Sequence, residues 1–146
     1  MALLRARESI MGFFRPRLNE LGLTEQQWRI MRVLYEHQDL EFHKLARLAC
    51  ILPPSLTGML TRLEGKGLLR RRRVATDQRR LHLSLTREGS ARFESMSKHM
   101  EELYLVIETQ FGRQRLARLF SLLRKAQELR VPAVSGYSRI RRPHSS

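Results

Sequence analysis

ACILPPSLTGMLTRLEGKGLLRRRRVATDQRRLHLSLT, residues Ala49 to Thr86, carries the signals of a helix followed by a β-hairpin. Pro53 and Pro54 lack a backbone N–H and are tolerated at the start of a helix, whereas Gly65 and Gly67 are typical of a helix end. Between these limits, apolar residues recur at the i, i+3, i+4 and i+7 spacing of one buried helical stripe: Leu56, Met59, Leu60 and Leu63. We therefore predict an amphipathic helix that begins at the two prolines and ends at Gly65 or Gly67.

The face opposite this stripe is small and hydroxyl-bearing, whereas an ordinary exposed helix face carries pairs of Glu and Lys. On a helical wheel of about 100° per residue, its members are Pro54, Gly58, Thr61 and Gly65, flanked by Ser55, Thr57 and Arg62. A flat partner can approach such a face closely, and hydroxyl and guanidinium groups can bond to phosphates or base edges. This face is typical of a DNA-reading helix; the alternative is a poorly solvated surface helix without a ligand.

An arginine-rich hairpin is predicted to follow the helix. Four arginines stand together at 70–73, two more follow at Arg79 and Arg80, and Leu81, Leu83 and Leu85 then alternate with polar residues. Such alternation indicates a strand with one buried face. The basic tip of the hairpin can enter the minor groove of DNA, where the negative potential of narrow A·T-rich segments attracts arginine. The alternative, a solvated charge run, is weakened by the neighbouring helix.

Composition favours a nucleic-acid partner. The 146 residues carry a formal net charge of +14, and the sequence pI is about 11.4; both argue for an anionic partner, nucleic acid before membrane. No apolar run reaches the roughly 18 residues of a transmembrane helix. We expect no signal peptide, and the single cysteine, Cys50, favours the reducing cytosol. The compartment expected is the cytoplasm, with the protein associated with DNA.

The rest of the chain predicts further helices around this core. Helical patterns cover residues 2–21, 24–37, 43–50, 86–111 and 113–130, and a flexible basic tail is expected over 131–146. The fold class predicted is mainly α: a winged helix-turn-helix with a two- or three-stranded β wing. Residues 23–111 would form the DNA-binding domain with its long linking helix. Residues 1–22 and 112–130 would be dimerisation helices, because a winged helix alone cannot cover their apolar surface.

Two segments at this spacing resemble the MarR family of bacterial winged-helix regulators, and the resemblance extends over residues 3–130. They are SLTGMLTRLEGKGLLRR, from Ser55 to Arg71, and DQRRLHLSLTREG, from Asp77 to Gly89, which is similar to the family's D-x-R wing signature followed by L-T-x-x-G. Within the family, FFRP at 13–16, LTEQQWRIMRVL at 23–34 and ACILPPSLTG at 49–58 are similar to repressors of homoprotocatechuate (4-hydroxyphenylacetate) degradation operons.

The resemblance implies a homodimeric repressor that binds double-stranded operator DNA at a pseudo-palindrome and is released by a small phenolic or aromatic acid. It implies that Arg79 is the wing-tip arginine in the minor groove and that Asp77 orients its guanidinium. The full set of expected DNA contacts is Pro54, Ser55, Thr57, Gly58, Thr61, Arg62, Arg71, Arg72, Asp77, Arg79 and Arg80.

The aromatic effector is expected near the N-terminal helix. Met11, Phe14, Trp28 and Tyr35 could form the walls of a site for an aromatic ring, and Arg15 or Arg17 could bind its carboxylate. The alternative is that the aromatic side chains belong to the dimer core and the arginines are solvated.

No metal site, cofactor other than the effector, or enzymatic activity is expected. The five histidines lack the spacing of a ligand pair, and no phosphate-binding glycine loop or nucleophile–base set occurs. Cys50 could sense oxidants, but its apolar neighbours favour a buried structural cysteine. Two other functions stay open: a sequence-independent architectural DNA binder, which uses only charge, and a protein-interaction module with a basic surface.

Overall fold

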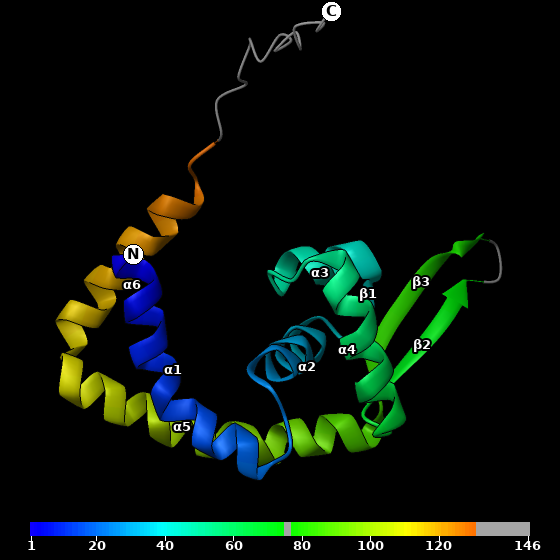
Figure 1. The fold of residues 1–146 in the computed structure, drawn as a ribbon, viewed down its shortest axis with the longest axis horizontal. Coiled ribbons are helices and arrows are strands. Elements are labelled where there is room, and N and C mark those ends of the chain that lie inside the picture. The colour runs from blue at the N-terminus through cyan, green and yellow to red at the C-terminus, as the bar shows by residue number, and fades with distance from the viewer. Residues whose placement is uncertain (75–76, 131–146) are drawn as a thin grey trace, which may run out of the picture. The chain divides into compact units, whose positions relative to one another are not determined.

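A computed structural model describes residues 1–74 and 77–130, and for residues 74 and 77–80 it describes the backbone alone. The elements, in chain order, are α1 (Ala2–Glu20), α2 (Glu25–His37), β1 (Leu40–Glu41), α3 (Phe42–Leu48), α4 (Pro53–Gly65), β2 (Leu69–Val74), β3 (Asp77–Leu85), α5 (Arg87–Phe111) and α6 (Arg113–Gln127) (Figure 1). The predicted class, mainly α with a small β wing, is confirmed. The chain forms one compact unit over Met1–Ile107 and a second that begins at Glu108.

The wing is part of a three-stranded antiparallel sheet with the order β1-β3-β2. The short strand β1 pairs Leu40 with Leu83, and the base of the hairpin pairs Leu69 with Leu85. Leu83 and Leu85 are buried and Leu81 is partly buried, as the alternating pattern predicted for one face of a strand. Leu40 and Leu69 on the neighbouring strands are buried as well. The prediction had left two or three strands open, and β1 is the third.

The core of the first unit lies where α2, α3, α4 and the sheet meet. Ile30, Leu45, Leu60 and Leu83 represent these four elements there, and each is fully buried. The buried residues of α4 are those of the predicted apolar stripe, Leu56, Met59, Leu60 and Leu63. Burial of this stripe turns the opposite face of α4 toward solvent, and this orientation positions the candidate site.

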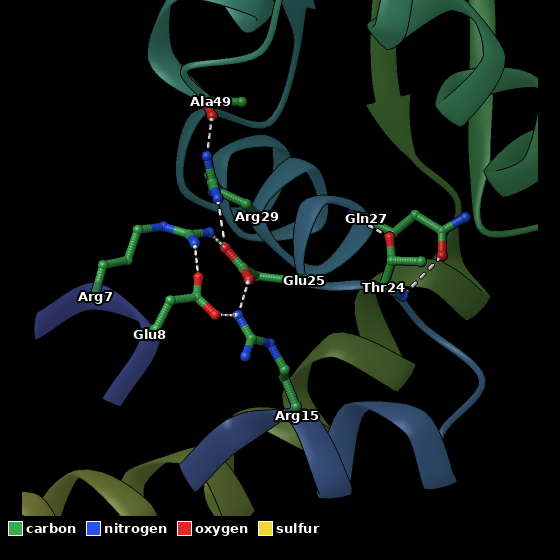
Figure 2. A network of polar contacts seen from close by, with 8 residues as sticks. All are labelled: Arg7, Glu8, Arg15, Thr24, Glu25, Gln27, Arg29 and Ala49. Carbon is green, nitrogen blue, oxygen red and sulfur yellow. Dashed lines mark hydrogen bonds and ion pairs between the residues drawn. The ribbon is translucent and has the colours of Figure 1, made fainter. Parts of the chain in front are cut away.

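A capping box starts α2, and the spacing of Thr24 and Gln27, three residues apart, is its signature in the sequence. Thr24 Oγ1 accepts a hydrogen bond from the Gln27 backbone N–H at 3.2 Å, and Gln27 Oε1 accepts one from the Thr24 N–H at 3.0 Å (Figure 2). Two N–H groups that the first helical turn cannot satisfy thereby find partners. Upstream, α1 continues through Pro16 to Glu20.

A close approach at Gly89 joins the start of α5 to the root of the wing. Thr86 caps α5 by accepting a hydrogen bond from the Gly89 N–H at 3.0 Å, and its hydroxyl donates to the Gly67 carbonyl at 2.6 Å. A Cβ atom at Gly89 would lie 2.0 Å from the Leu68 carbonyl oxygen. The L-T-x-x-G sequence therefore has a structural reason: the Thr caps the helix, and only Gly leaves room for the backbone of Leu68.

Two expectations about helix ends are wrong. The helix predicted over 43–50 spans Phe42–Leu48, and Cys50 has a φ of 51° in the turn that follows. This left-handed turn leaves Cys50 exposed, so the predicted burial of its thiol is also wrong. The last helix, predicted to reach residue 130, ends at Gln127. The predicted basic tail, residues 131–146, lies outside the described residues.

Across the described part of the chain, no helix combines the length and the apolar character needed to cross a membrane.

Candidate nucleic-acid interface and ligand region

Helices α3 and α4 form a helix-turn-helix whose second helix exposes the predicted reading face. The side chains or backbone positions predicted to face DNA are all exposed on α4: Pro54, Ser55, Thr57, Gly58, Thr61 and Arg62. The end of α4 packs against β2, so that the helix and the basic hairpin lie side by side (Figure 1). The sequence pattern thus correctly separated the core face of α4 from its solvent face.

Arg71 is the link between the hairpin and the exposed face of α4. Its Nη2 donates a hydrogen bond to Thr61 Oγ1 at 2.7 Å, and its Nε lies 2.8 Å from Glu64 Oε2. The Thr61 hydroxyl in turn donates to the Thr57 carbonyl at 3.1 Å. The predicted site residues Thr57, Thr61 and Arg71 are therefore connected to one another before any ligand is present, and Glu64 is a partner that sequence reasoning missed.

Arg72, the next residue along β2, reaches the opposite side of the sheet. Its Nη2 donates to Asp39 Oδ2 at 3.3 Å, and His82 Nδ1 lies 2.9 Å from the other oxygen of Asp39. Arg71 and Arg72 thus lie in different surroundings, as the alternation of side chains along a strand requires. Arg72 is the more exposed of the two, with 69% of its side chain accessible against 24% for Arg71.

The hairpin tip is described only in part. The backbones of Val74 and Asp77 pair across the two strands, which confirms a hairpin at this place. The side chains of Asp77, Arg79 and Arg80, which the sequence assigns to DNA contacts, lie outside the described residues.

An aromatic cluster occupies the region expected for the effector. Trp28 stacks on Phe93 with ring centroids 4.6 Å apart, and Tyr35 lies at the same distance from Phe93 on a tilted plane. Phe14 lies 4.9 Å from Tyr104. Of the predicted ligand residues, Phe14 and Trp28 are buried, whereas Met11 and Tyr35 are partly buried. Tyr35 also donates a hydrogen bond to Glu94 at 2.9 Å, and this bond raises the pKa of Tyr35.

Sequence reasoning missed Phe93 and Tyr104, although a signal for Phe93 was present. Phe93 belongs to the i, i+3, i+7 stripe that Met96 and Met100 continue on α5, and all three are buried. Tyr104 stands out only through its partners: Arg32 Nη1 donates to its hydroxyl at 3.2 Å, and the Arg32 guanidinium carbon lies 5.7 Å from its ring centre. Such long-range pairs leave no mark in local periodicity.

Arg15 belongs to a network of charged side chains that joins α1 to α2 and to the end of α3 (Figure 2). Its Nη2 lies 2.5 Å from Glu8 Oε2 and 3.8 Å from Glu25 Oε2. Arg7 pairs with both of these carboxylates. The hydrogen bond from Arg15, helped by the charges of Arg15 and Arg7, holds the pKa of Glu8 below its usual value. Arg17, the other cation considered for the effector, pairs with Glu20 at 2.6 Å.

The described residues contain no cluster of His, Cys, Asp and Glu suited to a metal ion. A hollow of about 330 Å³ lies beside the turn between α3 and α4, and Cys50 and His43 are among its lining residues.

Comparisons with known proteins agree with this architecture. Residues 23–81 match the MarR family. The homoprotocatechuate degradative operon repressor of Escherichia coli is 50% identical over 123 residues, which cover 84% of this chain and 83% of that protein. Among solved structures, NadR in complex with 4-hydroxyphenylacetate is 46% identical with a TM-score of 0.77, and the match covers 88% of this chain and 92% of NadR. The transcriptional repressor CouR, bound to a 23-mer DNA duplex, is 27% identical with a TM-score of 0.81, and the match covers 87% of this chain and 90% of the CouR chain. Given this fold, the wing and the identity to these relatives over most of its length, the chain belongs to the MarR family.

Proposed function

We propose that the protein is a homodimeric transcriptional repressor of an aromatic-acid catabolic operon, active in the bacterial cytoplasm, and not an enzyme. It binds a pseudo-palindromic operator and is released when a small aromatic carboxylate binds. The observation that carries the proposal is the exposed face of α4, which presents hydroxyls, glycine and Arg62 beside an arginine-rich strand. The relative from Escherichia coli, named for homoprotocatechuate degradation, and NadR with its bound 4-hydroxyphenylacetate support the choice of operon and effector.

Unpaired apolar surface supports the dimer. Phe120 and Leu122 of α6 are 51% and 56% exposed, and within the described part of the chain none of the residues of α6 is buried. In the first unit, Leu3 and Leu4 of α1 are similarly exposed at 68% and 59%. Contact between two copies would cover these side chains, and a two-fold dimer presents two recognition helices to half-sites about 34–36 Å apart.

The charged groups around the aromatic cluster favour Arg32 over Arg15 as the partner of an effector carboxylate. Arg15 is held by Glu8 at 2.5 Å, so a ligand would have to displace a carboxylate that is already in place. Arg32 lies over the Tyr104 ring, and its distance to the Glu36 carboxylate is 4.0 Å. A phenolic acid bound among Trp28, Tyr104 and Arg32 would gain ring contacts and a charge-assisted hydrogen bond.

The test is a fluorescence titration of labelled DNA from beside the protein's own gene against scrambled DNA of equal length. It is repeated with 4-hydroxyphenylacetate and with homoprotocatechuate, and the mass of the bound complex is measured by sedimentation. We expect a dimer that prefers the operator and releases it when effector is added. Arg32→Ala should abolish release while operator binding persists, and Arg15→Ala should retain release. Equal affinity for both DNAs, with a steep salt dependence, would instead identify an architectural DNA binder.

A second candidate function is release by oxidants through Cys50. It is favoured by the exposure of the thiol in the turn that directly precedes α4. A Cys50→Ser protein treated with peroxide separates the two functions: an oxidant sensor loses its peroxide response, whereas the response to an aromatic acid is unchanged.

A further inference from the structure

Arg71 and Glu64 together fix the chemical character of Thr61, a residue in the middle of the exposed face of α4. The Arg71 side chain crosses from β2 to the helix, where its two guanidinium contacts are Thr61 Oγ1 at 2.7 Å and Glu64 Oε2 at 2.8 Å. Because Arg71 is partly buried and held by one hydrogen bond and one ion pair, its orientation is set before DNA arrives. An arginine whose only role is to bind a phosphate does not require contacts with Thr61 and Glu64.

The hydrogen-bonding capacity of Thr61 is nearly used up by these neighbours. A threonine hydroxyl has one donor hydrogen and two acceptor lone pairs. The hydrogen of Thr61 is donated to the Thr57 carbonyl at 3.1 Å, and one lone pair accepts from Arg71. Toward solvent, Thr61 can therefore offer one acceptor lone pair and its methyl group, and no donor.

We propose that the Glu64–Arg71 pair makes Thr61 an acceptor-only reader, so that α4 discriminates against guanine at the base that Thr61 contacts. In the major groove, guanine shows two acceptors, whereas adenine and cytosine show amino donors and thymine shows a methyl group. An acceptor-only threonine suits the last three and meets guanine with oxygen against oxygen. The inference rests on the proposed function, since it requires α4 to lie in the major groove.

Simple electrostatics and a positioning role predict different effects on DNA binding when the Glu64 charge is removed. Its side chain is 44% exposed on a helix that is to approach a polyanion, so simple electrostatics makes it a repulsive charge, and Glu64→Gln should tighten binding to every DNA. If Glu64 instead positions Arg71, its loss frees the guanidinium and, through it, the Thr61 hydroxyl. The Glu64→Gln protein should then tolerate guanine at one base, and that base should be the one at which Thr61→Val also changes the preference.

The experiment measures competition binding of the full-length protein to its operator and to every single-base replacement of one half-site. Wild type, Glu64→Gln, Arg71→Ala, Thr61→Val and Thr61→Ser are compared, with Arg72→Ala as the control on the same strand. We expect Glu64→Gln and Arg71→Ala to weaken discrimination against guanine by roughly 2- to 10-fold at one base pair, the range of a single net hydrogen bond. Thr61→Ser keeps the hydroxyl and should retain the discrimination, whereas Arg72→Ala should scale all affinities alike.

Several outcomes overturn the inference, and they differ from failure of the proposed function. If wild type binds all replacements and scrambled DNA equally, the proposed function is wrong. If wild type discriminates but Glu64→Gln and Arg71→Ala change all affinities by one common factor, the positioning role is wrong. A Thr61→Val protein with an unaltered base preference shows that Thr61 does not read sequence. Thermal melting of each variant identifies any that is unfolded, and Glu64→Gln, an exposed and isosteric change, keeps the test decisive if Arg71→Ala fails to fold.

Discussion

Arg29 Nη1 donates a hydrogen bond to the backbone carbonyl of Ala49 at 3.0 Å, across twenty residues of chain. Its other terminal nitrogen donates to Glu25 Oε1 at 2.9 Å, and Glu25 pairs with Arg7 of α1 (Figure 2). Ala49 is the residue before the left-handed Cys50 turn that leads into α4. The start of the recognition helix is thus tied to the N-terminal helix through two side chains of α2.

Removing this tie should loosen the turn before α4. We expect Arg29→Ala to lower the free energy of unfolding by roughly 1–2 kcal/mol, the range for a partly exposed hydrogen bond from a charged group. Operator affinity should also fall, because the start of α4 loses its anchor. Denaturant unfolding and DNA titration measure the two effects. Arg47→Ala, at an exposed arginine of the same helix-turn-helix, is the control, and equal behaviour of the two variants would contradict the anchoring role.

The ion pair between Glu8 and Arg15 should be lost only in acid. The pKa of Glu8 lies below the usual value of 4.5 because Arg15 donates a hydrogen bond to the Glu8 carboxylate. A carboxyl whose pKa is lower in the folded state stabilises the fold above its unfolded pKa, and this contribution disappears as the pH falls through the folded pKa. We expect the difference in melting temperature between wild type and Glu8→Gln to be constant near neutrality, to shrink as the pH falls below 4.5, and to vanish only below the lowered pKa of Glu8. Glu102→Gln on the exposed side of α5 is the control, and a difference that persists in strong acid would exclude the pair as its source.

Gly89 and Gly65 form a matched pair for testing the close approach at the wing root. Gly89→Ala places a methyl group 2.0 Å from the Leu68 carbonyl oxygen, whereas a Cβ at Gly65 meets nothing within 4 Å. We expect Gly89→Ala to destabilise the protein by about 1–3 kcal/mol or more, as overpacking does, and Gly65→Ala to stabilise it by roughly 0.4–1 kcal/mol. Thermal melting of the two variants measures both changes in stability. If Gly89→Ala leaves the stability unchanged, α5 can shift away from the wing at little cost.

At the wing tip, simple electrostatics and a positioning role for Asp77 predict opposite changes in operator affinity. Side chains of successive strand residues point to opposite faces, so only one of Arg79 and Arg80 can enter the minor groove. The resemblance to the MarR family assigns this role to Arg79, and Arg79→Ala should therefore weaken operator binding far more than Arg80→Ala. If Asp77 orients the Arg79 guanidinium, Asp77→Ala should also weaken binding, although it removes a negative charge beside DNA. Titration against the operator at fixed salt is the measurement. Tighter binding by Asp77→Ala would show that Asp77 acts only as a repulsive charge and does not orient Arg79.

What could be predicted from the sequence was local. The buried stripe of α4 and the Thr24–Gln27 capping box follow from spacing within a few residues, and the structure confirms both. Partners that are distant along the chain were beyond reach. Arg71 was expected to contact DNA, but nothing in the sequence indicates that its guanidinium reaches Thr61, ten residues earlier. The proposed DNA contacts and the effector site stay predictions.

The error at Cys50 has a definite physical origin. Its apolar neighbours suggested a core position, but the chain reverses there with a positive φ, and at this reversal the side chain is exposed. Ala49 and Ile51 on either side are buried. Periodicity describes elements well and describes the single residues between them poorly.

The exposure of Cys50 also gives this molecule a built-in spectroscopic handle. It is the only cysteine of the sequence, and it precedes α4 by three residues. A thiol-reactive spin label or fluorophore would therefore attach at one defined point beside the recognition helix of each subunit. Distances between the two labels of a dimer, recorded with and without DNA, would report the separation of the two recognition helices without any engineered residue.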